Sequence, residues 1–330
     1  MYKISILIPV YNVEKYIKNC LESLLKNSLI HDCEIIICDD CTPDNSMTIV
    51  NEFVSENPTL NIKIIKHEVN KKIAITRQDL LQQATGKYII FVDSDDWVES
   101  NYLENLYKCA EASQADIVSC DAIKNYSNTN VIKKTRIKSE QIDNIKDLIS
   151  TKIPGYLHCK LLRREVIEKN NIEFDNEVNI CEDMLFLLKF LFYSSIYVNT
   201  NEPLYNYRIL NSHSQYSDFK AFNRLLCLKK IEDFLIFTNT YDIYKESLAH
   251  RKIFTFLKIF ENAPKNEYKK YYEYFSGQYS LIKIKNRKTL LYKVLSFFID
   301  TKQFFFVNSF LFIKKIQNKL KNIKVQKIVD

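Results

Sequence analysis

Hydrophobic residues in the first 120 positions form short continuous runs that alternate with segments of helical periodicity. A continuous apolar run indicates a strand buried on both faces, whereas apolar residues three and four positions apart indicate a helix with one buried side. The runs predict five strands, at 3–10, 34–38, 62–66, 88–92 and 116–120. The periodic segments predict four helices, at 13–27, 42–56, 74–84 and 101–112. This alternation predicts an α/β fold with right-handed crossovers and a mostly parallel sheet flanked by helices.

Two of these helices carry further local signals. The first has an apolar face made by Ile17, Leu21, Leu24 and Leu25. In the second, Thr42 is a suitable N-cap and Pro43 suits the first helical position, so we expect that helix to begin there.

The pattern is weaker after residue 120. We expect a polar surface excursion at 121–150, a strand or turn leading into a helix at 156–170, and an apolar helix at 184–193. A short strand is expected at 196–198, followed by a loop at 203–214. From about 218 the pattern is helical. We therefore expect an α/β domain at 1–215 and a helical, basic, aromatic-rich region at 216–330.

Polar residues follow three of the predicted strands at their carboxyl ends. Pro9-Val10-Tyr11-Asn12 closes the first strand, Asp39-Asp40 the second, and Asp93-Ser94-Asp95-Asp96 the fourth. In parallel sheets ligands bind beyond these ends, so we expect the three segments to line one cleft. The carboxylates of Asp93, Asp95 and Asp96 would repel one another, so we expect a cation opposite this segment.

The low glycine content limits how the chain could bind a phosphate group. Three glycines cannot build a GxGxxG turn or a Walker loop, so a bound phosphate would need a metal, arginine or lysine. Carboxylates one residue apart suit Mg²⁺ or Mn²⁺, whose shell substrate phosphates complete. Cys38 and Cys41 form a CxxC without a second ligand pair, so we interpret them as small packed residues and not as a zinc site.

Charge divides the chain unevenly. The net charge is +7, yet residues 265–330 hold 15 Lys and Arg against 4 Asp and Glu, so the rest is slightly acidic. Nine cysteines without a paired framework suit a reducing cytoplasm, and the first residues enter a strand without a secretory signal pattern.

Four segments together resemble the inverting nucleotide-sugar glycosyltransferases of family 2, which have the GT-A fold. These segments are SILIPVYN, EIIICDD, AITRQDLLQQATGKYIIFVDSDDW and ICEDMLF, and they cover roughly residues 3–210. The chain departs from the family where Cys41 replaces a glycine after the acidic pair. It also lacks the glycine and asparagine that usually flank the arginine of the third segment.

The resemblance implies a role for each matching residue. Asp40 would accept the ring N–H of the base, and Asp93 would lie by the ribose and metal. Asp95 would bind Mn²⁺ or Mg²⁺, and Asp183 would be the catalytic base. The remaining nucleotide-binding residues would be Pro9, Val10, Tyr11, Asp39, Arg77 (facing the diphosphate) and Ser94.

Other residues keep two interpretations. Asp183 is also a suitable N-cap for the helix after it. Trp97 is either a core aromatic or the floor of a sugar site, and Asp96 is expected to contact an acceptor or donor sugar. Glu182 contacts a donor or acceptor sugar or is solvated. His213 completes the metal shell or is a surface residue. His158 and Lys160 are expected to pack or to position a loop.

These features predict a metal-dependent inverting glycosyltransferase that uses a nucleotide-diphosphate sugar, with UDP favoured. Its acceptor would be a glycan or lipid-linked glycan of a cell-surface polysaccharide or lipo-oligosaccharide. A sugar-phosphate nucleotidyltransferase is the alternative enzyme, although it would need a glycine-rich phosphate loop. The basic tail raises a second alternative, nucleic-acid binding, but no such module is present and we expect none.

The tail suggests where such an enzyme works. Phe-rich clusters interspersed with lysines contain no uncharged stretch of 18 residues, so we expect the tail not to span a bilayer. Helices of this kind suit the interface of an anionic membrane. We therefore expect a cytoplasmic protein, peripheral at the inner face of the membrane, unless the aromatics pack on the catalytic domain.

Overall fold

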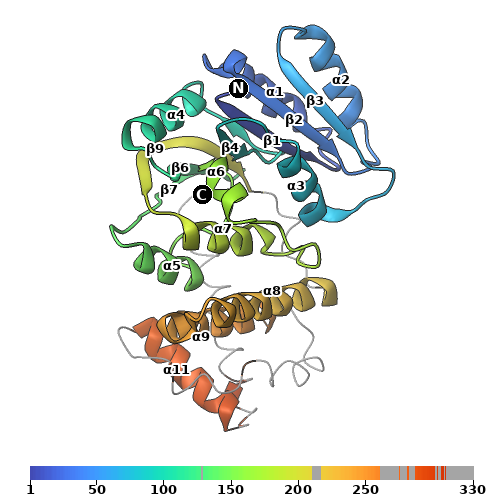
Figure 1. The fold of residues 1–330 in the computed structure, drawn as a ribbon. Helices are drawn as coiled ribbons and strands as arrows, with labels where there is room; N and C mark the ends of the chain where they lie inside the picture. Colours follow the sequence, from blue (N-terminus) through green and yellow to red (C-terminus); the bar gives the residue numbers. More distant parts are fainter. Residues whose placement is uncertain are drawn as a thin grey trace. The chain divides into compact units, whose positions relative to one another are not determined.

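The structure, a computed structural model, describes residues 1–127, 129–209, 217–260 and 287–301, together with 275, 281, 303, 306, 307 and 309. The chain divides into two compact units, Met1–Asn211 and Ser212–Asp330. The first unit is a mixed sheet between layers of helices (Figure 1).

Four neighbouring strands in the sheet are parallel, in the order β3 (Asn61–Lys66), β2 (Cys33–Asp39), β1 (Ile4–Val10) and β4 (Tyr88–Phe91). Every residue of β1, β2 and β4 is buried, as their mainly apolar sequences predict. Val10 is paired with Asp39 and Leu7 with Phe91, so these strands end at one edge. The parallel half of the sheet was therefore predicted correctly.

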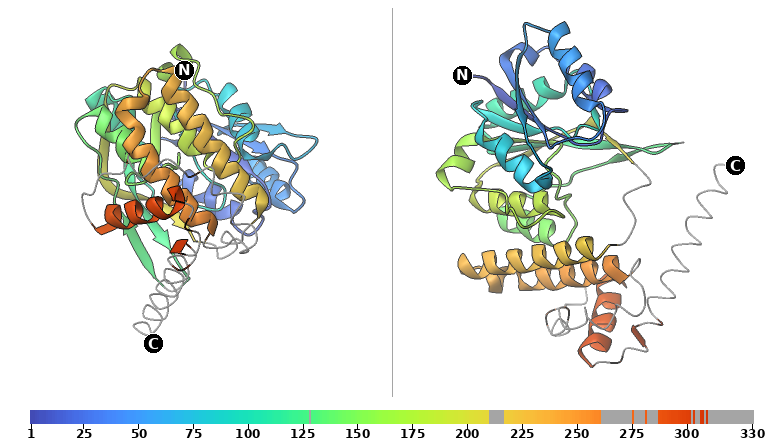
Figure 2. Two further views of the ribbon diagram at one scale, coloured as in Figure 1. Left: turned by 90° about the horizontal axis from the view of Figure 1, so that it is seen from below. Right: turned by 90° about the vertical axis from the view of Figure 1, so that its right-hand side faces the viewer.

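The remaining strands extend the sheet beyond β4. The order continues β8, β6, β9 and β5, and β7 pairs with β6. Figure 2 shows the strands and helices of this unit from two further directions. The β4–β8, β8–β6 and β9–β5 pairings are antiparallel, whereas β6 and β9 run parallel. Their bounds are β5 Trp97–Val98, β6 Ile117–Asn125, β7 Asn130–Lys133, β8 Lys160–Arg163 and β9 Tyr197–Arg208.

Helices cover both faces of this sheet. One face packs against α1 (Ile17–Leu25), α2 (Ser46–Glu56) and α4 (Tyr102–Ser113) in a single apolar core. On the other face Phe91 of β4 contacts Phe186 of α7 (Glu182–Tyr193) with ring centroids 6.5 Å apart. The other helices of this unit are η1 Ile30–Asp32, α3 Lys72–Gln82, α5 Gln141–Ile149 and α6 Arg164–Lys169.

Four expectations from the sequence were wrong. Cys41 was expected to be buried, as Cys38 is, but it is exposed. Helix α2 begins at Ser46 after Asn45, because the Thr42 hydroxyl bonds to Asp44 instead of capping a helix. The expected excursion at 121–150 contains β7, α5 and the end of β6. The expected loop at 203–214 begins as strand, because β9 continues to Arg208, where cross-strand pairing with β6 overrides its mixed local chemistry.

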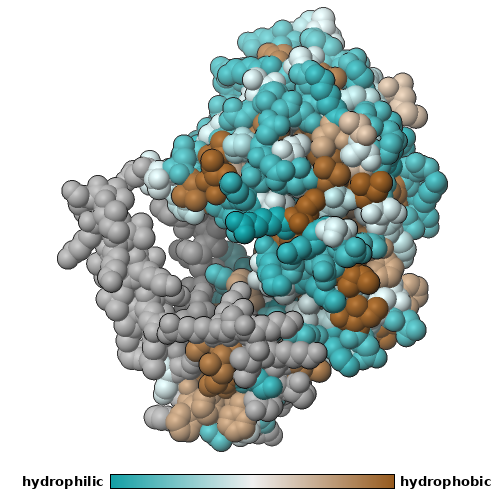
Figure 3. Space-filling view, turned by 90° about the vertical axis from the view of Figure 1, so that its left-hand side faces the viewer, coloured by the Kyte–Doolittle hydropathy of each residue, from teal (hydrophilic) through white to brown (hydrophobic). Residues whose placement is uncertain are grey.

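The second unit is helical where it is described. It contains α8 (Asp218–Phe237), α9 (Tyr241–Phe260) and α11 (Arg287–Asp300). Large apolar side chains are exposed on these helices, including Phe222, Phe237 and Leu290. Figure 3 shows hydrophobic residues at the surface of the molecule among mainly hydrophilic ones. Within the described part of the chain, no helix has the length and apolar character needed to cross a bilayer.

A hydrogen-bond cluster fixes the edge of the parallel strands opposite their carboxyl ends. Glu34 Oε1 accepts from the Ser5 hydroxyl (2.6 Å) and from the backbone N–H groups of Thr85 (2.6 Å) and Gly86 (3.1 Å). A Cβ on Gly86 would lie 2.6 Å from the Ser5 nitrogen and 2.8 Å from the Ile4 carbonyl carbon. Only glycine fits between β1 and this turn.

We predict that Gly86→Ala lowers the free energy of unfolding by about 1–3 kcal/mol, because the added methyl group overlaps backbone that cannot move aside. Urea denaturation measures the change. Thr59→Ala is the control, since Thr59 is exposed and the substitution adds no atoms to a packed site. Equal losses in the two variants would contradict the argument.

Candidate active site

The carboxyl ends of β1 and β2 continue into two loops that hydrogen-bond to each other. The backbone N–H of Asn12 donates to Thr42 Oγ1 (2.8 Å), and that of Glu14 donates to Asp44 Oδ2 (2.9 Å). The N–H of Thr42 in turn donates to Asp39 Oδ1 (2.8 Å). These bonds hold both loops at one edge of the sheet. Pro9 and Val10 are buried within β1, whereas Tyr11 is 48% exposed beside this edge.

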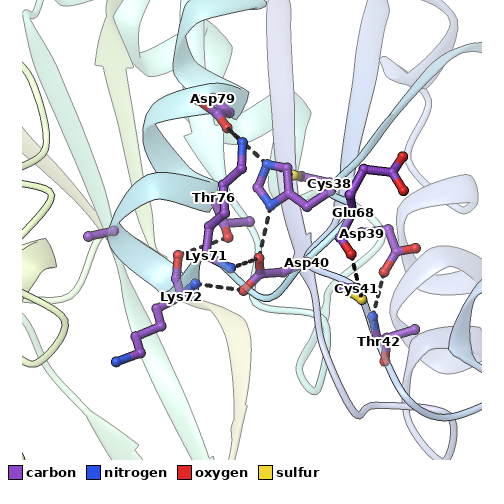
Figure 4. Close-up of polar contacts among 12 residues, drawn as sticks. Cys38, Asp39, Asp40, Cys41, Thr42, Glu68, Lys71, Lys72, Thr76 and Asp79 are labelled. Atoms are coloured by element: carbon purple, nitrogen blue, oxygen red, sulfur yellow. Dashed lines mark hydrogen bonds and ion pairs between the residues drawn. The ribbon is translucent and has the colours of Figure 1, made fainter.

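Asp40, the residue directly after β2, is buried against the backbone at the start of α3 (Figure 4). Its Oδ1 accepts from the backbone N–H of Lys71 (2.7 Å), and its Oδ2 accepts from that of Lys72 (3.0 Å). His67, the residue directly after β3, places Nδ1 2.8 Å from Asp40 Oδ1. The sequence interpretation missed His67, although its position at the end of a parallel strand could have identified it.

The carboxylate of Asp93 lies opposite two basic groups. Arg77 Nη2 donates to Asp93 Oδ1 (2.9 Å), and His158 Nδ1 lies 2.9 Å from Asp93 Oδ2. Burial alone would raise the pKa of Asp93, but His158 and Arg77 outweigh it and lower that pKa below its usual range. The acidic segment is therefore balanced by cationic and hydrogen-bonding groups before any ligand binds.

Asp96 has a different environment from its neighbours. It is fully buried, and its oxygens accept from the Tyr205 hydroxyl (2.9 Å) and the Arg208 backbone N–H (2.7 Å). Burial, together with the Asp93 and Asp95 carboxylates, raises the pKa of Asp96 to about 9. Asp96 thus joins the acidic segment to β9, and its expected contact with a sugar stays a prediction.

Asp95 and Trp97 are half-buried, and Ser94 is buried. Arg208 donates from Nε to the Asp95 carbonyl (2.9 Å) and lies 4.6 Å from the Trp97 ring centroid. The guanidinium of Arg208, in β9, therefore covers the ring of Trp97, in β5. Trp97 is not part of the central core. His213, the other expected metal ligand, lies outside the described residues.

An aromatic stack adjoins Asp93. The His158 ring is stacked on those of Tyr156, Tyr205 and Tyr207, with centroids 4.3, 4.7 and 5.2 Å away. Lys160 is buried and donates to the Tyr156 carbonyl (2.6 Å). Both His158 and Lys160 thus pack, as expected, and His158 also orients the carboxylate of Asp93.

Glu182 and Asp183 lie in the first turn of α7. Arg77 Nη1 donates to Glu182 Oε1 (2.6 Å), so one guanidinium bridges Glu182 and Asp93. Cys181 occupies the cap position, which rules out Asp183 as the N-cap. The Met184 N–H donates to Asp183 Oδ1 (2.7 Å). Burial raises the pKa of Asp183 above its usual value, and the Arg77 guanidinium opposes this effect at both Asp183 and Glu182.

Several turns around this edge have left-handed backbones at residues other than glycine. The φ angles are 56° at Asn12 and Cys41, 71° at Lys72, 67° at Cys159 and 66° at Cys181. Such conformations cost about 1–3 kcal/mol each outside glycine and are concentrated at functional sites. Cys41 adopts the conformation that glycine would favour, so the departure noted in the sequence changes the residue but keeps a left-handed turn.

The donor set suits a hard divalent cation. Among the described residues, ligand atoms of Asp93, Asp96 and His158 lie within 4.8 Å of one another. Asp95 is not part of that group. Carboxylate oxygens at the end of a buried strand are the ligands that Mg²⁺ and Mn²⁺ prefer. The oxygens of both Asp93 and Asp96 already bond to protein groups, and Asp95 stays the metal ligand predicted from the sequence.

The fold and this arrangement of carboxylates define a glycosyltransferase of the GT-A type. The profile described as "Glycosyl transferase family 2" matches residues 5–170. The chain therefore belongs to glycosyl transferase family 2, which confirms the family, fold and enzyme class expected from the sequence.

Two relatives show the range of the similarity. The chain is 32% identical to the glycosyltransferase EpsH of Bacillus subtilis over 254 residues, covering 74% of this chain and 72% of EpsH. It is 29% identical over 203 residues to TarS of Staphylococcus aureus, a poly(ribitol-phosphate) β-N-acetylglucosaminyltransferase, covering 61% of this chain and 33% of TarS.

Solved structures support the fold. The structure of S. aureus TarS 1-349 in complex with UDP-GlcNAc has a TM-score of 0.71 at 19% identity and covers 96% of this chain and 92% of its own. A Pyrobaculum calidifontis mannosyltransferase in complex with GDP-Man and Mn²⁺ has a TM-score of 0.55 at 13% identity, with 96% and 88% covered.

We predict that Asp44→Asn destabilises the protein by about 1 kcal/mol at pH 7, because Asp44 joins the two loops. Partial burial opposes its charge, but hydrogen bonds from Ser46, Thr42 and Glu14 lower the pKa of Asp44 to about 2. Since this pKa is below the unfolded value, the stabilisation is present above about pH 4 and is lost as the pH falls towards 2.

Urea denaturation at pH 7, 4 and 2.5 tests this prediction. The difference between the wild-type and variant free energies of unfolding should shrink on acidification. A difference that stays constant across this range would show that the charge of Asp44 is not what stabilises the loops.

Proposed function

We propose that this chain is a metal-dependent inverting glycosyltransferase that moves a sugar from a nucleotide-diphosphate donor, preferentially UDP-linked, to a glycan acceptor. The observation that carries this proposal is the Arg77 bridge, which brings Asp93 of the DxD segment next to the α7 turn with Asp183. The UDP-GlcNAc complex of the similar TarS structure supports the donor class.

We assign the nucleotide to the loops after β1 and β2, with Asp40 accepting the ring N–H of the base. Pro9 and Val10 would shape this pocket through their backbone, since their side chains are buried, and Tyr11 would cover the base. The Asp39 carboxylate accepts from the Thr42 N–H and holds the turn after β2, and Ser94 is assigned to the same donor site. A metal held by Asp93 and Asp95 would supply Lewis-acid stabilisation of the negative charge on the leaving diphosphate.

Asp183 is assigned the role of general base. The Met184 N–H holds its Oδ1, so Oδ2 is the oxygen that receives the proton of the acceptor hydroxyl. The acceptor oxygen bonds to the anomeric carbon as the bond to the diphosphate breaks, and the leaving group takes the electron pair. Because burial raises the pKa of Asp183, it is a stronger base than an exposed aspartate. One displacement inverts the anomeric centre.

Incubation with UDP-, GDP- and dTDP-sugars and Mn²⁺ tests this function by measuring released nucleotide. We expect turnover that EDTA abolishes. Asp183→Asn should reduce turnover by about 10² or more, because the amide cannot accept the proton, while calorimetry still detects nucleotide binding. Activity retained in the variant or in EDTA would contradict the roles of the base or the metal, respectively.

The same proposal places the enzyme at the cytoplasmic face of the membrane, acting on a lipid-linked glycan for a cell-surface polymer. By their names, TarS and a similar Bacillus spizizenii glucosyltransferase act on poly(ribitol-phosphate), which supports a polymeric acceptor. The apolar side chains exposed on α11, such as Leu290 and Phe297, adjoin a lysine-rich sequence. Most of the tail that led to this expectation lies outside the described residues.

We predict that the full chain floats with anionic vesicles at low salt and not with neutral ones, because each lysine near the surface adds about 1 kcal/mol of attraction. Replacing Lys314, Lys315, Lys319 and Lys321 with Gln should weaken flotation at unchanged activity on a water-soluble acceptor. Wild-type protein that stays at the bottom of the gradient with anionic vesicles would exclude a membrane role for the tail.

A further inference from the structure

His67 lies between two carboxylates that come from different elements. Its Nδ1 is 2.8 Å from Asp40 Oδ1 at the end of β2, and its Nε2 is 2.9 Å from Asp79 Oδ2 on α3. Cys38 Sγ is 3.5 Å from Nε2. The imidazole is only 3% exposed. Because carboxylates accept and do not donate, both ring contacts are satisfied when both nitrogens carry hydrogen.

The backbone at the start of α3 holds the same carboxylate from the other side. Lys71 has a right-handed conformation (φ −94°, ψ −6°) and Lys72 a left-handed one (φ 71°). This succession forms a concave pair of N–H groups that binds anions. Asp40 fills it, with both amides within 3.0 Å of its oxygens (Figure 4).

The hydrogen bonds to Asp40 leave one acceptor direction unused. Oδ1 accepts from His67 and Lys71, which uses both of its lone pairs, whereas Oδ2 accepts only from Lys72 among the described residues. The carboxylate therefore cannot rotate without breaking three bonds. A ligand N–H that approaches this edge would find a single oxygen in a fixed direction.

We propose that His67, supported by Asp79, is a positioning residue for nucleotide selection. It fixes Asp40 so that one lone pair of Oδ2 accepts the ring N–H of a uracil or guanine base. Cytosine carries a lone pair at the corresponding ring nitrogen, and two acceptors facing each other repel. The inference rests on the proposed function, since it requires that Asp40 contacts the base of the donor.

The test compares the affinities of UDP, GDP and CDP by isothermal titration calorimetry, with Mn²⁺ present. We expect the wild-type protein to bind the tighter of UDP and GDP at least about tenfold better than CDP, the size of one charge-assisted hydrogen bond. His67→Gln donates through one amide group only, and Asp79→Asn keeps an acceptor but loses the charge.

Both variants should weaken the preferred nucleotide about fivefold or more and leave CDP nearly unchanged, so that selectivity falls. The KM for the donor should rise while kcat and the KM for the acceptor change little, which a general loss of structure would not produce. Asp32→Asn is the matched control, because it removes an exposed ion pair with Lys3 at the opposite edge of the sheet.

Two results would overturn the inference. In the first, Asp40→Asn reduces selectivity but His67→Gln and Asp79→Asn, folded by thermal melting, do not. In the second, Asp40→Asn itself has no effect, which also removes Asp40 from the donor site while leaving the transferase activity intact. Absence of binding by all three nucleotides to the wild-type protein would contradict the proposed donor class as well as this inference.

Discussion

The ion pairs of Arg77 are the interaction on which the arrangement of the site depends. Its guanidinium joins the end of β4 to the first turn of α7, which is 105 residues away from Arg77 in the chain. All three side chains are largely buried, and a buried carboxylate without a partner costs several kcal/mol. The acidic residues that give the site its chemistry can therefore lie close together only while this one cation remains between them.

Helix α3 extends this role along its length. Its first amides bind Asp40, Arg77 in its middle binds Asp93 and Glu182, and Asp79, two residues after Arg77, binds His67. The regions assigned to the base and to the diphosphate are thus held by a single rigid element. A shift of α3 relative to the sheet would alter both regions together, so we regard it as the helix that sets the spacing of the donor site.

The sequence predicted correctly the elements that depend on local patterns, and it missed features that depend on contacts between residues far apart in the chain. Strands β1, β2 and β4 were identified because burial on both faces requires continuous apolar sequence, and the alignment of their ends placed Asp39 and Asp93 at one edge. Tyr205, whose hydroxyl accepts from the Asp93 N–H 112 residues away, has no local signal of its role. The same holds for His158 and for the continuation of β9, since both depend on contacts between distant segments.

The left-handed turns place side chains of residues other than glycine around the candidate site. A glycine at such a turn presents only backbone, whereas Asn12, Cys41 and Lys72 add an amide, a thiol and an amine where the loops approach the site. Each turn therefore places a side-chain functional group where a glycine would place none. Cys41 is exposed, and it provides a point at which a thiol-reactive probe could be attached beside the loops after β1 and β2.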